Sequence, residues 1–476
     1  MKKSVSVILV LCCMFAMLSV SVSATDTSTK NLDAAKKAYN SEKVIINDSV
    51  DTLQSDLFEA ALEKASDKSP CIVYIPAGKS YVIAEEKVHN SDNIKAGYQS
   101  GVYVPENVVL VAEDDTVIKA GSSMQRLVLV SGSVYGGKYD GANKTYYTLQ
   151  FKNGTVFEKT KSGDKQVDGN IEYTAVTGAT KGGIKAIGCK NIRICCNKIY
   201  DCTTSNACGI SIMYGSYATS VSKNTVTNIG SNKKGSGIDI THATASNVNS
   251  NTISKTGGHG ISTDTEQTPA SKTKQSYVRI GNLKSNKISK TGTHGIWLEK
   301  KCYVTGSFSS NTITNAGSCG LAIQGTHKYP GDNKYVIKTM TSNTIKSSKR
   351  SNISLTGKYG LMRLGKNNVI GNSVEQCSIV VDQKAKLYIT GTGNKINGSK
   401  EYGIYLKNGS YLKSEQKKTY IQENGKYAIG LATESKAVIK YATLTNNTKG
   451  SAYVGKGSTL KLTSCKSDKV VNGKSA

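Results

Sequence analysis

The sequence predicts an all-β fold, a parallel β-solenoid with an N-terminal α-helical cap. Three observations favour this fold. An Asn-x-[Ile/Val] unit recurs along the chain, and most copies are followed by a glycine and a short strand of alternating residues. The region is rich in β-branched residues, Gly, Asn and Ser, and it has no 3.6-residue period, which excludes a helical solenoid.

The asparagine units define the coils, which we place at about residues 184–465. Each coil should carry two or three short strands that pair with the next coil. We expect Ile and Val to face inward, and each Asn to adopt the left-handed bend and to bond to the Asn above and below. The copies are Asn197-Ile199, Asn224-Val226, Asn251-Ile253, Asn286-Ile288, Asn311-Ile313, Asn343-Ile345, Asn372-Val374 and Asn394-Ile396.

The glycine strands set the register of the coils. They are "GISI" from Gly209, "GIDI" from Gly237, "GIST" from Gly260, "GIWL" from Gly295, "GLAI" from Gly320 and "GIYL" from Gly403. We expect the second and fourth residues after each glycine to face outward. One outward column is then Ser211, Asp239, Ser262, Trp297, Ala322 and Tyr405, and the other is Met213, Thr241, Asp264, Glu299, Gln324 and Lys407.

The N-terminal region differs from the repeats. "DTLQSDLFEAALEKAS" at about 51–66 places Leu53, Leu57, Phe58, Ala61, Leu62 and Ala65 on one helical face, with Asp51 as N-cap. Such a helix would cover the open end of the solenoid. We therefore expect one domain at 45–465, a linker at 25–44 and a C-terminal tail at 466–476.

The first residues predict export. Lys2 and Lys3 precede the apolar run "VILVLCCMFAML", and "SVSVSA" offers a cleavage site at Ala24, so residues 1–24 read as a Sec signal peptide. No later stretch approaches the ~20 apolar residues of a membrane-spanning helix. We expect a secreted, monomeric protein.

The net charge of +28 points to anionic partners. Its lysines are scattered along the chain, and such a surface attracts polyanions. For an exported protein we expect an acidic polysaccharide or an anionic cell-wall polymer. Aromatic residues are few and no recognition motif is found, which argues against nucleic acid. A basic surface without a dedicated partner is the alternative.

The chain resembles the right-handed parallel β-helices of the pectate lyase and polygalacturonase superfamily. The resemblance rests on "VYIPAG" at Val73–Gly78, "VPENVVLV" at Val104–Val111, "VYGGKYDG" at Val134–Gly141 and the Asn-x-Ile repeats. It implies a right-handed β-helix over roughly 45–465, a fold that hosts lyases, hydrolases, epimerases and non-catalytic adhesins.

Gly258-His259-Gly260 matches one motif of the polygalacturonase-like hydrolases within this superfamily. Their Asn-Thr-Asp and paired-aspartate motifs are missing from the two preceding coils, which read "NTV" and "SGID". The hydrolase activity therefore does not carry over from the resemblance.

Two coils have longer connections, at Asp264–Gln275 and at Gln324–Tyr335. Both leave the same strand position, so we expect them to overhang one face, as binding loops on repeat proteins do. Harmless loop growth is the alternative. Gln324 and His327 of the second segment, and Lys300, are candidate substrate-binding residues.

The candidate catalytic residues lie between these connections. Asp264 and Glu299 should be one strand spacing apart, about 5 Å. At that separation one carboxyl raises the pKa of the other, or the pair could bind Ca²⁺. Asp239 lies nearby, and Trp297 offers a face for stacking on a sugar. Alternatively, the carboxylates pair with Lys255, Lys290 or Lys300.

Two histidines occupy one column, Cys208, Ser236, His259, His294 and Cys319. A neutral imidazole beside carboxylates serves as general acid or base. Strand parity instead predicts that both rings point inward.

We thus expect a carbohydrate-active protein that binds, and cleaves or epimerises, a uronate-containing polysaccharide. Its proposed catalytic residues are Asp239, His259, Asp264, His294 and Glu299, with a lyase-like or glycosidase-like reaction. No cofactor is indicated beyond possible Ca²⁺ binding. The alternative is a non-catalytic envelope or adhesion protein that binds anionic wall polymers.

Overall fold

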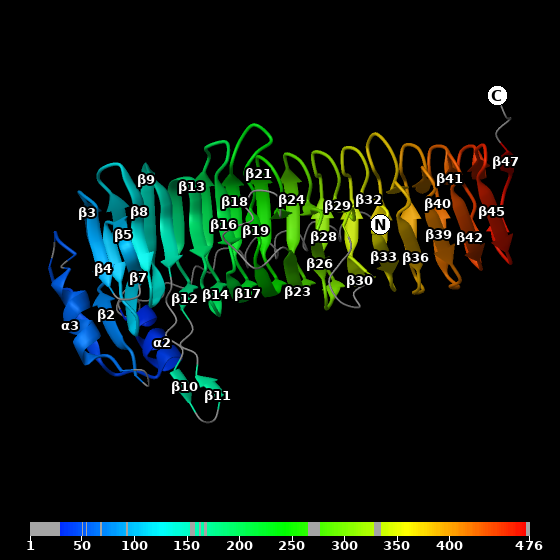
Figure 1. Cartoon of the computed structure of the whole chain (residues 1–476). Helices are drawn as coiled ribbons and strands as arrows, with labels where there is room; N and C mark the ends of the chain where they lie inside the picture. Colours follow the sequence, from blue (N-terminus) through cyan, green and yellow to red (C-terminus); the bar gives the residue numbers. More distant parts are fainter. Residues whose placement is uncertain are drawn as a thin grey trace, which may run out of the picture.

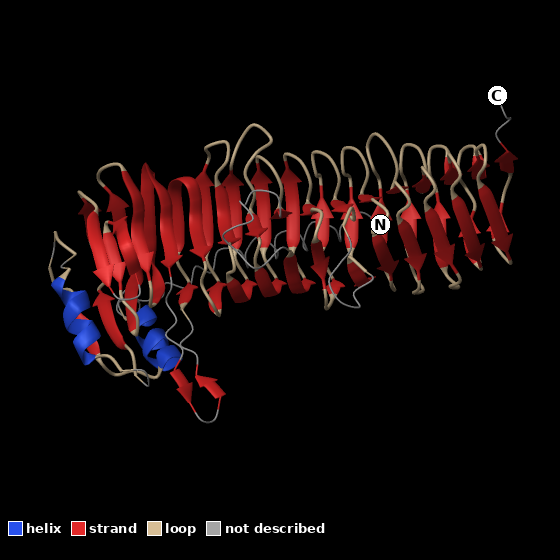
Figure 2. Cartoon of the chain, in the orientation of Figure 1, coloured by secondary structure: helices blue, strands red, loops and turns tan. Residues whose placement is uncertain are grey.

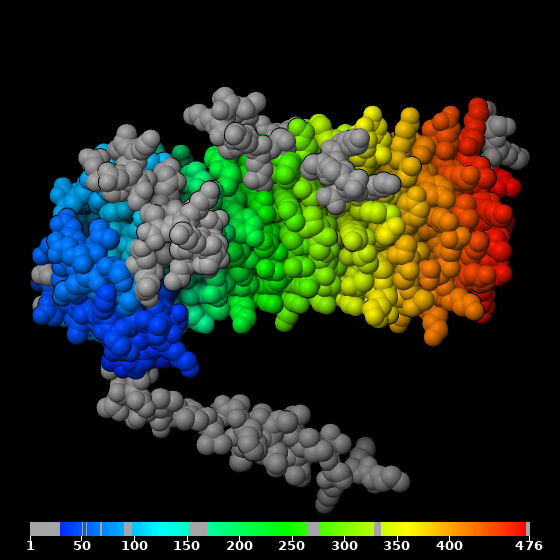
Figure 3. Space-filling model, turned by 60° about the horizontal axis from the view of Figure 1, so that its bottom comes forward, coloured from blue at the N-terminus to red at the C-terminus, as the bar shows by residue number. Residues whose placement is uncertain are grey.

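The computed structural model describes residues 29–472 except 50, 54, 67–68, 92–93, 153–157, 161–162, 166–168, 265–276 and 328–334. The predicted signal peptide thus lies outside the described residues. The chain forms one elongated stack of coils running from the N-terminal to the C-terminal part (Figure 1). Strands joined by short loops make up most of it (Figure 2), and the space-filling view shows the coils following one another along its length (Figure 3).

Three series of parallel strands run along the stack from about residue 190 onward. The first series carries the predicted glycine strands. It consists of β16 (Cys208–Met213), β19 (Ile238–Thr241), β22 (Ile261–Asp264), β25 (Ile296–Leu298), β29 (Leu321–Gln324), β32 (Ile353–Thr356), β35 (Ile379–Asp382), β38 (Ile404–Leu406), β41 (Tyr427–Leu431), β44 (Gly450–Val454) and β47 (Val470–Asn472).

The second and third series complete each coil. The second consists of β14 (Ile192–Cys195), β17 (Tyr217–Ser222), β20 (Thr244–Asn249), β23 (Val278–Lys284), β26 (Cys302–Val304) with β27 (Phe308–Ser309), β30 (Ile337–Thr341), β33 (Leu361–Leu364), β36 (Lys386–Ile389), β39 (Tyr411–Ser414), β42 (Lys436–Lys440) and β45 (Thr459–Thr463). The third consists of β15 (Lys198–Cys202), β18 (Thr225–Ile229), β21 (Thr252–Thr256), β24 (Lys287–Thr291), β28 (Thr312–Thr314), β31 (Thr344–Lys346), β34 (Val369–Gly371), β37 (Lys395–Asn397), β40 (Thr419–Gln422), β43 (Ala442–Leu444) and β46 (Lys466–Ser467).

The N-terminal coils combine short strands with the long strands β7 (Val108–Ala120), β9 (Ser133–Lys152) and β13 (Ala175–Ile187). The other strands are β1 (Val44–Ile46), β2 (Cys71–Ile75), β3 (Ser80–Ile83), β6 (Val102–Val104), β8 (Met124–Val130) and β12 (Asn170–Glu172). β13 pairs with both β15 and β16, so it continues into two series. Two antiparallel pairs form separate sheets, β4 (Lys87–Ser91) with β5 (Ile94–Ser100), and β10 (Glu158–Thr160) with β11 (Gly163–Lys165). Of these, β5 contacts β8 of the stack.

Two helices lie in the described N-terminal part. α3 (Asp56–Lys64) packs Phe58 and Ala61 into the apolar interior. It begins after Ser55, not at Asp51, and its predicted inward residue Leu62 is 47% exposed. A helix therefore exists where one was predicted, while its capping of the solenoid end stays a prediction.

The boundaries of the β-helix differ from those expected. The expected linker at 25–44 contains α2 (Lys30–Tyr39), whose first backbone N–H groups donate to the carboxylate of Glu113. Leu32 and Ala35 pack against β2 and β7. Strands also continue into the expected tail, as far as Asn472. Within the described residues, neither helix has the length and hydrophobicity needed to cross a bilayer.

A buried asparagine ladder joins the coils at the start of the third series. Each Asn except the last donates from Nδ2 to Oδ1 of the Asn in the next coil, at 2.9–3.0 Å. The same Oδ1 also accepts the backbone N–H of the donating Asn. A second Nδ2 bond reaches a backbone carbonyl, as from Asn286 to Val248. The members are Asn197, Asn224, Asn251, Asn286, Asn311, Asn343, Asn368 and Asn394.

Two details of the predicted repeat are wrong. Asn368, not Asn372, belongs to the ladder, because Ile345 pairs with Ile370 and Val374 is 57% exposed. The left-handed bend falls on the residue before each Asn, with φ of 75° at Gly393 and between 55° and 61° at the others. The Asn side chain is thus free to point inward and bond along the stack.

The ladder changes column near the C-terminus. In the coil after Asn394, the equivalent position is occupied by Thr419. The hydrogen bonding continues instead through Asn424 and Asn447, which follow the strands of the third series instead of preceding them. Asn424 Oδ1 also accepts the N–H of Ser399.

Replacing one ladder asparagine should destabilise the fold. Asn286→Ala removes partners from buried polar groups of Asn251 and Asn311 and of the Val248 carbonyl, so we expect a loss of about 3–5 kcal/mol in the free energy of unfolding. Denaturant unfolding measures this loss. The control is Asn372→Gly, at an exposed position whose positive φ glycine adopts readily. A loss for Asn286→Ala no larger than that of the control would contradict the ladder's role.

Candidate functional site

The structure brings the predicted columns together on the outer face of the first series. Ser211, Asp239, Ser262, Trp297 and Ala322 pair in consecutive coils, as predicted. Two further coils, with Ser354 and Val380, separate Ala322 from Tyr405. Two adjoining clefts of about 750 and 600 Å³ lie over these columns and share Trp297. We call them the first and second cleft.

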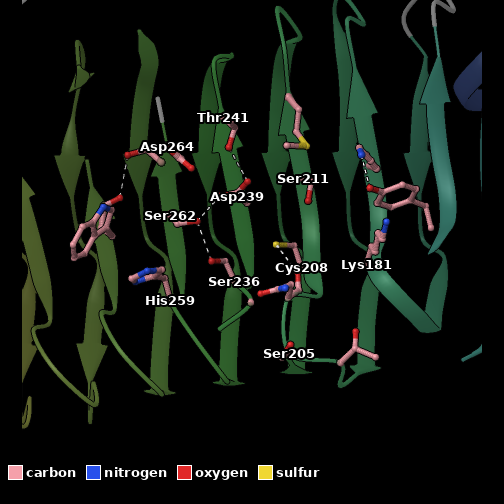
Figure 4. Close-up of a pocket in the computed structure, with 18 of the residues that line it drawn as sticks. Lys181, Ser205, Cys208, Ser211, Ser236, Asp239, Thr241, His259, Ser262 and Asp264 are labelled. Carbon is pink, nitrogen blue, oxygen red and sulfur yellow. Dashed lines mark hydrogen bonds between the residues drawn. The ribbon is translucent and has the colours of Figure 1, made fainter. Parts of the chain in front are cut away.

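The first cleft gathers most of the predicted catalytic residues. It is lined by Asp239, His259, Asp264, Trp297 and Glu299. Of these, Asp239, His259 and Asp264 lie on neighbouring coils of one face (Figure 4). His294 and Gln324 line the second cleft. Lys300 lines neither of the two clefts, and His327 is exposed, with its Nδ1 2.9 Å from Thr326 Oγ1. Most of the two inserted segments lies outside the described residues.

The glycine that follows each histidine, Gly260 or Gly295, lies at a corner of its coil. At this corner the histidines turn outward, contrary to strand parity. A Cβ on Gly260 would lie 2.4 Å from Cγ2 of Ile288 and 2.5 Å from the carbonyl oxygen of Gly295. Gly260 and Ile261 therefore both face the interior, and the alternation restarts between them. His259, on the other side of this corner, points into the first cleft.

Burial raises the pKa of two carboxyl groups in the first cleft, those of Asp239 and Glu299. Burial, the charge of Asp264 and a hydrogen bond with Asp264 raise the pKa of Glu299 to about 7, and a hydrogen bond from Trp297 opposes them. Within the described residues no lysine or arginine forms an ion pair with Asp239 or Glu299. The alternative of simple pairing with lysines thus finds no support at these two residues.

Asp239 is bound by two hydroxyl groups. Thr241 Oγ1 donates to Oδ2 at 2.9 Å, and Ser262 Oγ lies 2.5 Å from Oδ1. Burial raises the pKa of Asp239, and these two hydrogen bonds oppose the shift. The hydroxyl bonds fix the orientation of this carboxyl in the cleft.

The two histidines and Trp297 form one aromatic cluster. The imidazole rings are stacked at 5.3 Å and 4°, and Trp297 lies 5.2 Å from His259 and 4.4 Å from His294. Burial lowers the pKa of His259 to about 4, and burial and the neighbouring His259 lower the pKa of His294 to about 3. Nδ1 of His294 accepts the N–H of Cys319. Both imidazoles are therefore neutral at neutral pH.

Sequence reasoning missed Lys185 and Tyr147 at the N-terminal end of the first cleft. Lys185 pairs with Ser211, so it belongs to the outward column of Asp239, and its Nζ donates to the Tyr147 hydroxyl. Burial and the charges of Arg126 and Lys181 lower the pKa of Lys185 to about 8. "GIKA" at Gly183 has the same pattern as "GISI" and was the available signal.

A calcium site is not built from the described residues alone. No group of three or more His, Cys, Asp or Glu side chains among them is arranged to hold a metal ion. Ca²⁺ dependence therefore stays a prediction, and no step below is derived through the ion.

A family model described as the right-handed β-helix region matches residues 162–335 and 306–467, which is more than half of the chain. The chain belongs to the right-handed β-helix family. This confirms the family suggested by the sequence. A search of curated proteins finds no significant match.

Several solved structures are similar to this chain at low identity. The A-module of a mannuronan C-5 epimerase from Azotobacter vinelandii is 12% identical, with a TM-score of 0.46, over 86% of this chain and 99% of that chain. The catalytic unit of an α-1,3-glucanase from Streptomyces thermodiastaticus is 14% identical, with a TM-score of 0.42, over 90% and 69%. A surface adhesin of Streptococcus pneumoniae is 11% identical, with a TM-score of 0.29, over 91% and 92%. The site is therefore interpreted from its own residues.

The chain's one tryptophan should report the protonation of Glu299. Because the Glu299 carboxyl accepts from Trp297 and has a pKa of about 7, it is neutral below pH 7 and anionic above it. We expect the fluorescence of Trp297 to change with a midpoint near pH 7. Glu299→Gln should abolish this transition, and Asp264→Asn should move it to lower pH by removing a negative charge.

Glu415→Gln is the control for this titration. Glu415 is exposed on the second series and pairs with Lys413 and Lys440, so this variant should keep the midpoint. A transition near pH 7 that survives in Glu299→Gln would assign it to another group.

Proposed function

We propose that this protein is a secreted enzyme that cleaves or epimerises a uronate-containing polysaccharide. The observation that carries the proposal is the pair Asp264 and Glu299, in which one carboxyl keeps a proton near neutral pH. It lies in a cleft beside a neutral histidine and an aromatic ring. An acid and a base in reach of one bound sugar are what proton transfer at a uronate requires.

Each group has a role in this proposal. Trp297 stacks on the sugar, and neutral His259 accepts the proton from the carbon beside the uronate carboxylate. Glu299 in its acid form donates its proton. His294, whose Nδ1 is occupied by the N–H of Cys319, positions His259 and Trp297 by stacking.

The two reactions differ only in the last step. In elimination, the C–H bond and the neighbouring glycosidic C–O bond break, a C=C bond forms, and the leaving oxygen takes a proton from Glu299. In epimerisation, the glycosidic C–O bond is retained, the proton removed from the carbon stays on His259, and Glu299 delivers its own proton to the opposite face of that carbon. Cationic groups stabilise the enolate-like intermediate of either reaction.

The charge of the protein supports an anionic substrate. The net charge is +28, and Lys181 and Lys185 line one end of the first cleft while Arg350 lines the second cleft. An acidic polymer lying along the clefts would meet positive charge at both ends. Secretion, through the predicted signal peptide at 1–24, would bring the protein to such polymers.

Activity is tested on polygalacturonate, alginate and glycosaminoglycans, with added Ca²⁺ and with chelator. Elimination gives unsaturated uronates with ultraviolet absorbance, and epimerisation in heavy water incorporates deuterium. We expect Glu299→Gln to lower kcat/KM at least about 100-fold, as expected for loss of a general acid. Glu415→Gln should retain activity.

The rate should also fall as pH rises above about 7, since Glu299 then loses its proton. The absence of both products on every polymer would refute the enzymatic proposal. Together with salt-sensitive binding to anionic wall polymers, that result would favour the non-catalytic envelope protein.

A further inference from the structure

Four tyrosines form a row on the outer face of the C-terminal coils, three of them stacked and the fourth tilted. The rings of Tyr402 and Tyr405 are parallel, 4.6 Å apart at 8°, and Tyr427 lies 6.0 Å from Tyr402 at 18°. Tyr453 continues the row at 5.9 Å from Tyr427. All four are only partly buried. We call Tyr402, Tyr405, Tyr427 and Tyr453 the tyrosine platform.

The fold makes room for these rings with a glycine. Gly430 is the partner of Tyr405 in the next coil. A Cβ on Gly430 would lie 2.6 Å from the ring of Tyr402 and 2.8 Å from the ring of Tyr405. Both rings therefore occupy the space above this glycine, and the platform is a packed arrangement of fixed geometry.

The platform continues the two clefts. Tyr405 lines the second cleft, which Trp297 shares with the first. Tyr405 also stands in the column of Trp297, four coils further along, through Ala322, Ser354 and Val380. Four strand spacings of ~4.8 Å amount to about 19 Å. An extended sugar chain advances by about one such spacing per unit.

The lysines beside the platform are already paired. Lys407 Nζ lies 3.7 Å from Asp382 and Lys426 Nζ lies 2.6 Å from Glu401. Their charges are thereby largely neutralised, which leaves aromatic stacking as the contact that this surface offers. The Lys181 and Lys185 end of the first cleft has no such paired carboxylates among the described residues.

We infer that the tyrosine platform is a distal sugar-binding subsite, where Tyr405 stacks on a pyranose about four units from the one at Trp297. The identity of the polymer rests on the proposed function. The subsite itself rests on the stacked rings, the shared cleft and the coil register. It recognises the apolar face of a sugar, so its contribution does not depend on charge.

The test uses Glu299→Gln as the parent protein, so that no turnover occurs. Trimers and hexamers of galacturonate and of mannuronate are titrated, and Trp297 fluorescence counts only ligands bound over that residue. Tyr405→Ala should weaken hexamer binding about five- to tenfold through loss of one stacking contact. Trimer binding should not change, because a trimer at Trp297 does not reach Tyr405.

Two further variants separate stacking from folding. Tyr405→Phe should keep the parent's affinity, because it keeps the ring. Tyr217→Ala is the matched control, since Tyr217 is 36% exposed on the second series and away from the clefts. The loss caused by Tyr405→Ala should persist at high salt, and its circular dichroism spectrum should show that it is fully folded under the conditions of the titration.

An unchanged hexamer affinity in Tyr405→Ala, or an equal loss for trimer and hexamer, overturns the inference. Failure of the parent to bind any hexamer overturns it as well. Binding that depends on Tyr405 in a protein without lyase or epimerase activity would instead refute the proposed function and leave the subsite in place.

Discussion

The asparagine ladder holds the coils of this protein in register. Each side chain gives one hydrogen bond to the next coil and one to a backbone carbonyl, and its oxygen accepts two more. A buried amide left without these partners would cost more than an apolar residue at the same place. The ladder therefore stabilises only one alignment of neighbouring coils, and it makes every outward residue the neighbour of a fixed residue above and below.

The chemistry of the first cleft is a consequence of that fixed spacing. Side chains at equivalent positions in adjacent coils are separated by about one strand spacing, too short for two carboxylates to ionise independently. Asp264 and Glu299 lie at such positions, and burial together with the charge of Asp264 raises the pKa of Glu299 to about 7. The same spacing stacks His259 on His294. Burial lowers the pKa of both imidazoles, and the neighbouring His259 lowers that of His294 further. The repeat thus adds the effect of close neighbours to the effect of burial.

Much of this arrangement could be predicted from the sequence, because strand alternation is a local rule. The outward column from Ser211 to Ala322 follows directly from the alternation after each glycine. The outward direction of His259 could not be predicted in this way. It depends on the contact of Gly260 with Ile288 of another coil, a tertiary contact that local parity ignores. The same holds for Asn368, which the spacing of the repeat could not distinguish from Asn372.

The change of column in the ladder after Asn394 has a consequence for how such a protein can grow. Coupling between coils runs only between neighbours, and beyond Thr419 it passes through Asn424 and Asn447, at a different corner. The last coils are thus joined by a second set of asparagine hydrogen bonds, which does not extend to the coils that carry the first cleft. Coils at this end can be gained, lost or altered over evolutionary time while the carboxyl pair and the histidines keep their alignment, so the length of the binding surface can change separately from its chemistry.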